Sequence, residues 1–405
     1  MKIWHPYTQE AAEPPVLEIE RGEGPYLFTR DGRRLIDAIS SWWVNLHGHA
    51  HPVIAEAIAA QARKLEHVIF AGFTHSPAEE LAHALERYLP PSLNQIFYSD
   101  NGSTAVEVAL KIAIQYWHNK GRSSKRRIIA LENAYHGDTI GAMSVSADSP
   151  FTAAFAALRL PVLRVGSEED LARLLGERKD EIAAMIAEPL IQGAGGMIMY
   201  PPQRLETFRR LCAANEVLFI ADEVFTGFGR TGRMFACDHA GVVPDLMCLS
   251  KGLTAGFLPL AATVCSGEIY EAFYSTDRSR AFFHGHSYSG NPLGCAAAVA
   301  SLKIFQDEPV FERIAVIERI HRERLVEFRS HESIQDVRML GTIAAIELRA
   351  GDPGYLSSLR ARLYPHFLQH GVLLRPLGNI VYTVPPYVIS PDDLHYVYDV
   401  ISKAL

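Results

Sequence analysis

The chain has 405 residues, of which 48% are hydrophobic and 21% are charged, and its formal net charge at pH 7 is −7. This balance is typical of a globular protein with a large core, and the acidic surplus argues against nucleic acid or an anionic membrane as a partner. No apolar run is long enough to span a bilayer, and the five scattered cysteines contain no CxxC pair, so we expect a cytoplasmic protein without disulfides or a zinc site.

Residues 1–10, MKIWHPYTQE, lack the apolar core of a signal peptide, and residues 24–40 predict a hairpin around an Asp-Gly turn. His47, His49 and His51 alternate, as metal ligands sometimes do. No cysteine or carboxylate lies near enough in the sequence to complete such a site. We therefore expect no metal there.

The middle of the chain alternates short apolar runs with helical patterns. Such runs are typical of strands that are buried on both faces of a parallel sheet, and residues 103–117 between them have one apolar helical face. The fold class is therefore α/β, with a mostly parallel sheet. The expected strands are residues 94–98, 127–131, 183–187, 217–221 and 246–249.

The pattern changes after residue 302. A charged amphipathic helix is expected over 311–328, strand-like runs over 337–347 and 372–384, and a last helix over 391–405. We interpret this part as a smaller α+β domain. The predicted division assigns 1–50 and 305–405 to the small domain and 51–304 to the large domain.

The expected strand 94–98 leads into a loop that opens a helix. Gly102 allows close approach of the backbone, Ser103 offers a hydroxyl, and the start of the helix offers free N–H groups, which together favour a phosphate. The alternative is an ordinary N-cap, with Thr104 and Glu107 forming a capping box. The loop alone does not decide between them.

The expected strand 217–221 ends at Asp222. A carboxylate beside a buried strand needs a partner, and one suitable partner is a protonated pyridine nitrogen. The alternatives are a helix cap or an ion pair with Arg230 or Arg233.

The expected strand 246–249 leads to Lys251 among apolar neighbours, where a lowered pKa would let its amine attack an aldehyde. The carboxyl ends of parallel strands share one edge of a sheet. Lys251, Asp222 and the loop at Gly102 are therefore expected to meet. Phosphate, pyridine nitrogen and aldehyde together describe pyridoxal 5'-phosphate (PLP).

Residues 218–251, LFIADEVFTGFGRTGRMFACDHAGVVPDLMCLSK, resemble the signature of class III aminotransferases. The resemblance implies the type I PLP-dependent transferase fold and a homodimer with active sites at the subunit interface. It also implies that Lys251 holds the cofactor covalently, that Asp222 pairs with the pyridine nitrogen, and that Gly102 and Ser103 bind the phosphate.

Five further motifs narrow the resemblance: WHPYTQ (4–9), SSWWVNLHGHAHP (40–52), AYHGDTIGAMSV (134–145), EPLIQGAGGM (188–197) and LLRPLGN (373–379). They are similar to the branch of the family that transfers an amino group from S-adenosylmethionine to 8-amino-7-oxononanoate in biotin synthesis. This likeness implies that Tyr135 covers the cofactor ring and takes part in catalysis, that Arg375 binds the substrate carboxylate, and that Ser287 reaches the phosphate of the partner's site. The residues that it implies near the substrate or cofactor are Tyr7, Trp42, Glu188, Arg230 and Gly285.

Two departures from the family patterns bear on the substrates. Where the better-known form has His-Gly-Pro-Thr, this chain has His284-Gly285-His286-Ser287, so Ser287 keeps a hydroxyl and His286 changes the pocket wall beside the cofactor. A related form with a similar segment uses lysine as the amino donor, which leaves the donor open. Phe225 replaces the Gln of ornithine-type members and argues against ornithine or acetylornithine as the substrate.

Two alternative functions remain open at this point. One is another class III activity, such as a diamine or ω-amino acid aminotransferase, or an aminomutase. The other is a non-catalytic PLP-fold protein, against which the intact Lys251 and Asp222 argue.

Overall fold

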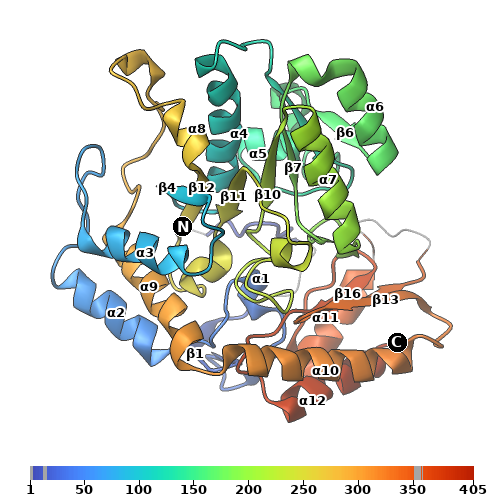
Figure 1. Ribbon diagram of the computed structural model, residues 1–405. Coiled ribbons are helices and arrows are strands. Elements are labelled where there is room, and N and C mark those ends of the chain that lie inside the picture. Colours follow the sequence, from blue (N-terminus) through green and yellow to red (C-terminus); the bar gives the residue numbers. More distant parts are fainter. Residues whose placement is uncertain (1–2, 12–15, 351–356, 358) are drawn as a thin grey trace.

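A computed structural model describes residues 3–11, 16–350, 357 and 359–405 (Figure 1). Its centre is a seven-stranded sheet in the order β4-β12-β11-β10-β7-β5-β6. Strand β12 is antiparallel to both neighbours, so β4 runs in the same direction as β11, and β11, β10, β7, β5 and β6 are parallel. The strands are β4 (Leu93–Ser99), β5 (Arg127–Leu131), β6 (Leu163–Val165), β7 (Ile182–Ala187), β10 (Leu218–Asp222), β11 (Leu246–Leu249) and β12 (Ala261–Ser266).

The inner strands are apolar because helices cover both faces of the sheet. Along β7, Ala184 and Ile186 join one hydrophobic cluster with helix α4, whereas Met185 and Ala187 join the other cluster. The five expected strands are confirmed, with the same bounds for β5 and β11. Strands β12 and β6 were not expected from the sequence.

The helices of this region surround the sheet (Figure 1). The expected helix 103–117 is α4, and it packs against β11, β12 and β7. The helices are α2 (Pro52–Ala62), α3 (Ser76–Glu86), α4 (Gly102–Asn119), α5 (Ile140–Val145), α6 (Glu168–Arg178), α7 (Pro202–Ala214), α8 (Gly267–Glu271) and α9 (Pro292–Asp307). Short 3₁₀ turns span Ala153–Leu158, Lys179–Glu181, Ala236–His239, Lys251–Thr254 and Arg278–Arg280.

Both ends of the chain meet in a second group of elements. The N-terminal strands β1 (Ile19–Glu23), β2 (Tyr26–Thr29) and β3 (Arg34–Asp37) form a sheet with β15 (Val372–Leu373), which is parallel to β3. The expected hairpin in 24–40 is confirmed as β2 and β3. Short helix α1 (Ser40–Trp43) follows it.

The C-terminal part forms a three-stranded antiparallel sheet with helices beside it. The expected run 337–347 is a hairpin of two strands, and the last helix ends at Ser402. The elements are β13 (Ile334–Leu340), β14 (Ile343–Leu348), β16 (Ile380–Thr383), α10 (Val310–Phe328), α11 (Leu359–Gln369) and α12 (Pro391–Ser402), and the small hairpin of β8 (Ile191–Gln192) and β9 (Ile198–Met199) lies earlier in the chain. Among the described residues, no helix has the length and apolar character needed to cross a membrane.

Candidate active site

The three predicted strand ends meet at one edge of the central sheet. A cavity of about 220 Å³ is lined by residues that follow β4, β10 and β11, among them Ser103, Asp222 and Lys251. This convergence arises because β4, β10 and β11 run in the same direction, although β12 lies between β4 and β11.

The N-terminus of α4 forms one wall of this cavity. The Asn101 side chain accepts a hydrogen bond from the Thr104 N–H at 3.1 Å, and the Asn101 N–H donates to the Thr104 hydroxyl at 3.1 Å. The cap is therefore Asn101, and the alternative capping box of Thr104 with Glu107 is wrong. The Glu107 carboxylate instead accepts from the Gly141 N–H at 2.6 Å, at the start of α5.

Two glycines bring backbone close to this helix terminus. A Cβ on Gly102 would lie 2.6 Å from the Val224 side chain, and one on Gly137 would lie 2.1 Å from the Ser103 Oγ. Gly137 also has a φ of 127°, which side chains disfavour. The backbone of residues 137 and 138 therefore lies close to the Ser103 hydroxyl, which accepts a hydrogen bond from the Asp138 N–H at 3.2 Å.

Asp222 is buried at the end of β10. One carboxylate oxygen lies 2.6 Å from the His136 Nδ1, and the other accepts from the Val224 N–H at 3.1 Å. The suggested ion pairs do not form, because the guanidinium groups of Arg230 and Arg233 bind backbone carbonyls elsewhere. Sequence reasoning missed His136, although it lies in the quoted motif 134–145.

Lys251 lies beside two aromatic rings. Its Nζ is 4.6 Å from the centroid of the Trp43 ring and 5.5 Å from that of Phe225. Burial lowers the pKa of Lys251 to about 8, although the charges of Asp222 and Glu188 act in the opposite direction. A part of this amine is therefore neutral near pH 7, as an attack on an aldehyde requires.

Glu188 is a buried residue in the wall of the first cavity. Its carboxylate accepts hydrogen bonds from the Tyr135 N–H and the Gly193 N–H, each at 2.9 Å. Burial raises the pKa of Glu188 to about 7. These bonds position the backbone of Tyr135, whose ring lines the cavity.

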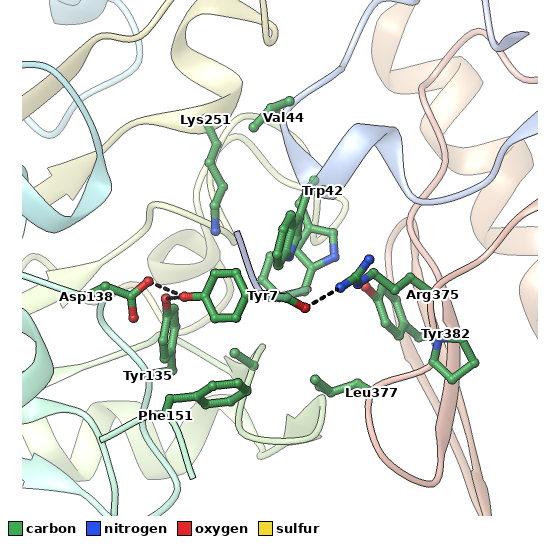
Figure 2. Close-up of a pocket in the computed structure, with 13 residues that line it drawn as sticks. Tyr7, Trp42, Val44, Tyr135, Asp138, Phe151, Lys251, Arg375, Leu377 and Tyr382 are labelled. Atoms are coloured by element: carbon green, nitrogen blue, oxygen red, sulfur yellow. Dashed lines mark hydrogen bonds between the residues drawn. The ribbon is translucent and has the colours of Figure 1, made fainter. Parts of the chain in front are cut away.

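A second cavity of about 330 Å³ adjoins the first, and Lys251, Trp43 and Tyr135 line both. Figure 2 shows Tyr7 reaching across it: the Tyr7 hydroxyl donates to the Asp138 carboxylate and lies 3.2 Å from the Tyr135 hydroxyl. Burial raises the pKa of Tyr135 well above its ordinary value, so this hydroxyl keeps its proton at neutral pH.

Arg375 and Trp42 form another wall of the second cavity (Figure 2). The Arg375 guanidinium donates to the Tyr7 carbonyl at 3.3 Å and lies 5.4 Å from the centroid of the Trp42 ring. The remaining walls are mainly apolar. They include Trp43, Val44, Phe151, Ala194, Pro376, Leu377 and Tyr382. Sequence reasoning missed Phe151, which no motif or strand end marks, and Leu377, which lies in the quoted motif 373–379.

Four predicted site residues line neither cavity. Arg230 is 1% exposed, and its guanidinium donates to the carbonyls of Trp43, Asn45 and Pro385, so the structure does not bring it to the cavity wall. Gly285, His286 and Ser287 lie on a surface loop, where His286 is 2.8 Å from the Asp100 carboxylate and Ser287 is exposed. Their roles stay predictions.

The three alternating histidines contact separate groups. His47 lies 3.3 Å from the Ser301 hydroxyl, His49 lies 2.9 Å from the Asp37 carboxylate, and His51 lies 3.4 Å from the Glu308 carboxylate. Their packing is accounted for by these contacts.

The residues of the first cavity fit PLP. The start of α4 offers N–H groups and the Ser103 hydroxyl to a phosphate, and Asp222 offers a buried carboxylate to a protonated ring nitrogen. Lys251 offers an amine of lowered pKa to an aldehyde. The buried Nε2 of His136 has no partner among the described residues, which agrees with a site built for a further group.

Comparison with known proteins decides the family. The sequence profile of the class III aminotransferases matches residues 7–405. The chain belongs to this family. Its members are PLP-dependent enzymes, so the chain is a PLP-dependent aminotransferase with the type I PLP fold.

Several relatives match over the full length. The chain is 48% identical to adenosylmethionine-8-amino-7-oxononanoate aminotransferase of Synechococcus elongatus, covering 100% of this chain and 98% of the relative, and 40% identical to that of Geobacter sulfurreducens, covering 100% and 95%. The crystal structure of the enzyme of that name from Methanocaldococcus jannaschii superposes with a TM-score of 0.95 at 39% identity, covering 99% of this chain and 96% of the other. The omega transaminase of Pseudomonas jessenii in complex with PMP superposes with a TM-score of 0.92 at 30% identity, covering 100% and 95%.

Proposed function

We propose that this chain transfers an amino group from S-adenosylmethionine to 8-amino-7-oxononanoate and so forms 7,8-diaminononanoate for biotin synthesis. The observation that carries the proposal is a mainly apolar cavity that begins at Lys251 and has Arg375 in its wall. This combination suits a substrate with an apolar chain, an amino or keto group at one end and a carboxylate at the other. The names of the full-length relatives support the same two substrates.

PLP, when bound, supplies an electron sink that makes the hydrogen on the amine-bearing carbon acidic. The proposed residue roles follow from their positions around it. Asp222 keeps the ring nitrogen protonated, His136 orients Asp222, and the start of α4 with Ser103 holds the phosphate. Lys251 would hold the cofactor through its aldehyde and would move the proton of the amine-bearing carbon.

The second cavity binds both substrates in turn, since the reaction is ping-pong. Arg375 binds the carboxylate of the keto acid through two of its N–H groups. Tyr7 and Tyr135, joined through their hydroxyl groups, position the substrate over Lys251, and Trp42 packs against its apolar chain.

The decisive experiment is the half-reaction. Purified, PLP-loaded protein is mixed with S-adenosylmethionine alone or with lysine alone, and conversion of the cofactor to its aminated form is followed by absorbance. We expect conversion by S-adenosylmethionine and its reversal by 8-amino-7-oxononanoate. Conversion by lysine only would overturn the assignment of S-adenosylmethionine as the donor. Absence of any response to 8-amino-7-oxononanoate would overturn the assignment to biotin synthesis. A Lys251→Ala variant, which lacks the covalent anchor, is the control.

Replacing Arg375 tests the assignment against another class III activity. Loss of a charge-assisted hydrogen bond costs about 1.5–3 kcal/mol, so Arg375→Ala is expected to raise KM for 8-amino-7-oxononanoate on the order of 10- to 100-fold. An amine donor without a carboxylate is the matched control and should be used with nearly unchanged KM. An equal increase in KM for 8-amino-7-oxononanoate and for the control amine would contradict the role of Arg375.

We further propose that the chain is a cytoplasmic homodimer in which Ser287 and His286 approach the cofactor of the partner subunit and Gly285 its substrate. The support is that Ser287 is exposed outside the cavities, between Phe283 and Tyr288, whose side chains are 76% and 64% exposed. The five cysteines are free thiols, which supports a reducing compartment. Light scattering measures the mass in solution, and a monomer that retains full activity would contradict the dimer.

The predicted domain division is kept as part of this proposal. The pairing of β15 with β3 supports a small domain built from 1–50 and 305–405 around the large domain 51–304. Limited proteolysis, with sequencing of the fragments, would test these boundaries.

A further inference from the structure

The amine of Lys251 faces an aromatic wall made of Trp43 and Phe225. The two ring centroids are 4.3 Å apart with an angle of 41° between the planes, and each side chain is 5% exposed. The Lys251 Nζ lies 4.6 Å and 5.5 Å from their centroids. Water therefore has no approach to the amine from the side of these rings.

The Phe225 ring is held in place from two directions. A Cβ on Gly193 would lie 2.7 Å from Phe225 Cδ1, so the ring packs directly on the backbone of residue 193. The Trp43 ring covers it on another side, and the same hypothetical Cβ would lie 3.4 Å from Trp43. The wall is thus built from three distant segments and leaves little room for a rearranged ring.

We propose that Phe225, together with Trp43, is a positioning residue that shields one side of the Lys251 amine from water and thereby favours its neutral, nucleophilic form at physiological pH. The proposal rests on the proposed role of Lys251 in holding the cofactor. Phe225 and Trp43 touch the lysine and act through it.

Two effects of the rings oppose each other. The face of an aromatic ring attracts an ammonium group, whereas loss of hydration disfavours that charge. Burial is the largest influence on the pKa of Lys251 and lowers it to about 8, Asp222 and Glu188 raise it, and Arg230 lowers it. If loss of hydration at the rings is the stronger effect, opening the wall raises the pKa of Lys251, and if attraction is the stronger effect, opening it lowers that pKa. The other titratable groups that line the two cavities with Lys251 are Tyr7, Tyr135, His136, Asp138, Arg375 and Tyr382.

The test measures the basicity of Lys251 directly. The full-length protein, freed of cofactor, is labelled with trace acetic anhydride at a series of pH values, and acetylation of the Lys251 peptide is quantified by mass spectrometry. Phe225→Leu opens the shielded side of the amine to water, so the midpoint of labelling is expected to rise by about one pH unit toward the ordinary value for lysine. Near pH 7 the labelling rate should fall by about tenfold.

Phe235→Leu is the matched control. Phe235 is also fully buried and packs against another ring, that of Phe228 at 5.7 Å, but lines neither cavity. Its replacement removes the same apolar volume and should leave the midpoint unchanged. Trp43→Phe, which keeps a ring, should give a smaller rise than Phe225→Leu, and Trp43→Leu provides a second opening of the wall where Phe225→Leu does not fold.

An unchanged midpoint in Phe225→Leu, or a fall, would overturn the proposal, because a fall would mean that attraction to the rings dominates. The cofactor-loaded wild-type protein separates this outcome from failure of the proposed function. PLP must protect Lys251 from acetylation. Absence of protection would refute the cofactor role of Lys251, whereas the pH shift in the cofactor-free protein would still be measured.

Discussion

At the scale of single residues, the site depends on what surrounds ordinary side chains. Glu188 is 5% exposed and binds two backbone N–H groups, so burial raises its pKa from 4.5 to about 7 while those bonds act in the opposite direction. The charge of His136 lowers this pKa, and the charge of Asp222 raises it. The carboxyl group therefore changes protonation in the pH range in which the enzyme is expected to work.

This raised pKa predicts a pH-dependent stability. Between about pH 4.5 and 7 the folded state keeps a proton on Glu188 that the unfolded state releases, so this contribution is complete below pH 4.5 and is lost as pH rises through 7. In Glu188→Gln, which is always neutral, the free energy of unfolding should fall less steeply from pH 5 to pH 8, by about 3 kcal/mol at most. Urea unfolding at several pH values measures this slope.

The matched control is Glu206→Gln on the exposed side of α7. Its curve should run parallel to that of the wild type. If Glu188→Gln also gave a parallel curve, the burial argument for Glu188 would be wrong, even where the variant is less stable at every pH because Gln loses one acceptor.

At the scale of elements, the start of α4 couples helix stability to cofactor binding. Asn101 caps the helix, and the next residues, Gly102 and Ser103, line the first cavity. The apolar face of residues 103–117 was sufficient to predict the helix. It was not sufficient to predict the cap, since both Asn101 and Thr104 are good cap residues and only the backbone geometry distinguishes them.

Removing this cap should lower both the stability of the protein and its affinity for PLP. Asn101→Ala is expected to lower the free energy of unfolding by about 1 kcal/mol and to weaken PLP binding, because the N–H groups at the start of α4 lose their fixed orientation. Ser167→Ala is the matched control, since Ser167 caps α6 through the Asp170 N–H away from both cavities. It should cost similar stability with unchanged PLP affinity. Equal PLP affinity in both variants would refute the coupling.

At the scale of the whole molecule, side chains from the C-terminal sheet reach the cavity region. The Arg338 guanidinium donates to the carbonyls of Gly196 and Met197 at 2.7 Å each, and it binds the carboxylates of Asp336 and Glu347. The loop that contains Gly193, on which Phe225 packs, is therefore tied to β13.

Replacing Arg338 should loosen this loop. Arg338→Met is expected to lower the free energy of unfolding by about 2 kcal/mol or more, because two carbonyls and two carboxylates lose a charged donor, and to raise KM for both substrates. Thermal unfolding and steady-state kinetics measure the two effects. Arg322→Met is the control, since Arg322 is exposed and binds only Glu318 on α10 in the described part of the chain. It should stay within about 0.5 kcal/mol of the wild type. An unchanged KM in Arg338→Met would show that the loop does not depend on this link.

The amino-acid sequence by itself determined the α/β class, the five expected strands and the meeting of Lys251, Asp222 and the loop at Gly102. The physical reason is that buried strands are apolar throughout and that parallel strands end at one edge, so local composition carries this information. These three groups already indicated PLP, and the family signature in 218–251 added the class III aminotransferases. Strands β6 and β12 were not predicted from the sequence, because β6 has only three residues and β12 contains small residues without a clear pattern.

Only the tertiary structure decided which residues surround the reactive groups. His136 meets Asp222 from 86 positions away, Phe225 and Trp43 meet at Lys251 from separate segments, and Arg230, expected at the pocket, binds three backbone carbonyls instead. Such contacts depend on how loops pack around the sheet, and no local periodicity encodes that packing. The sequence thus specified the elements and the reactive groups, and the packing of distant segments set their pKa values, partners and access to water.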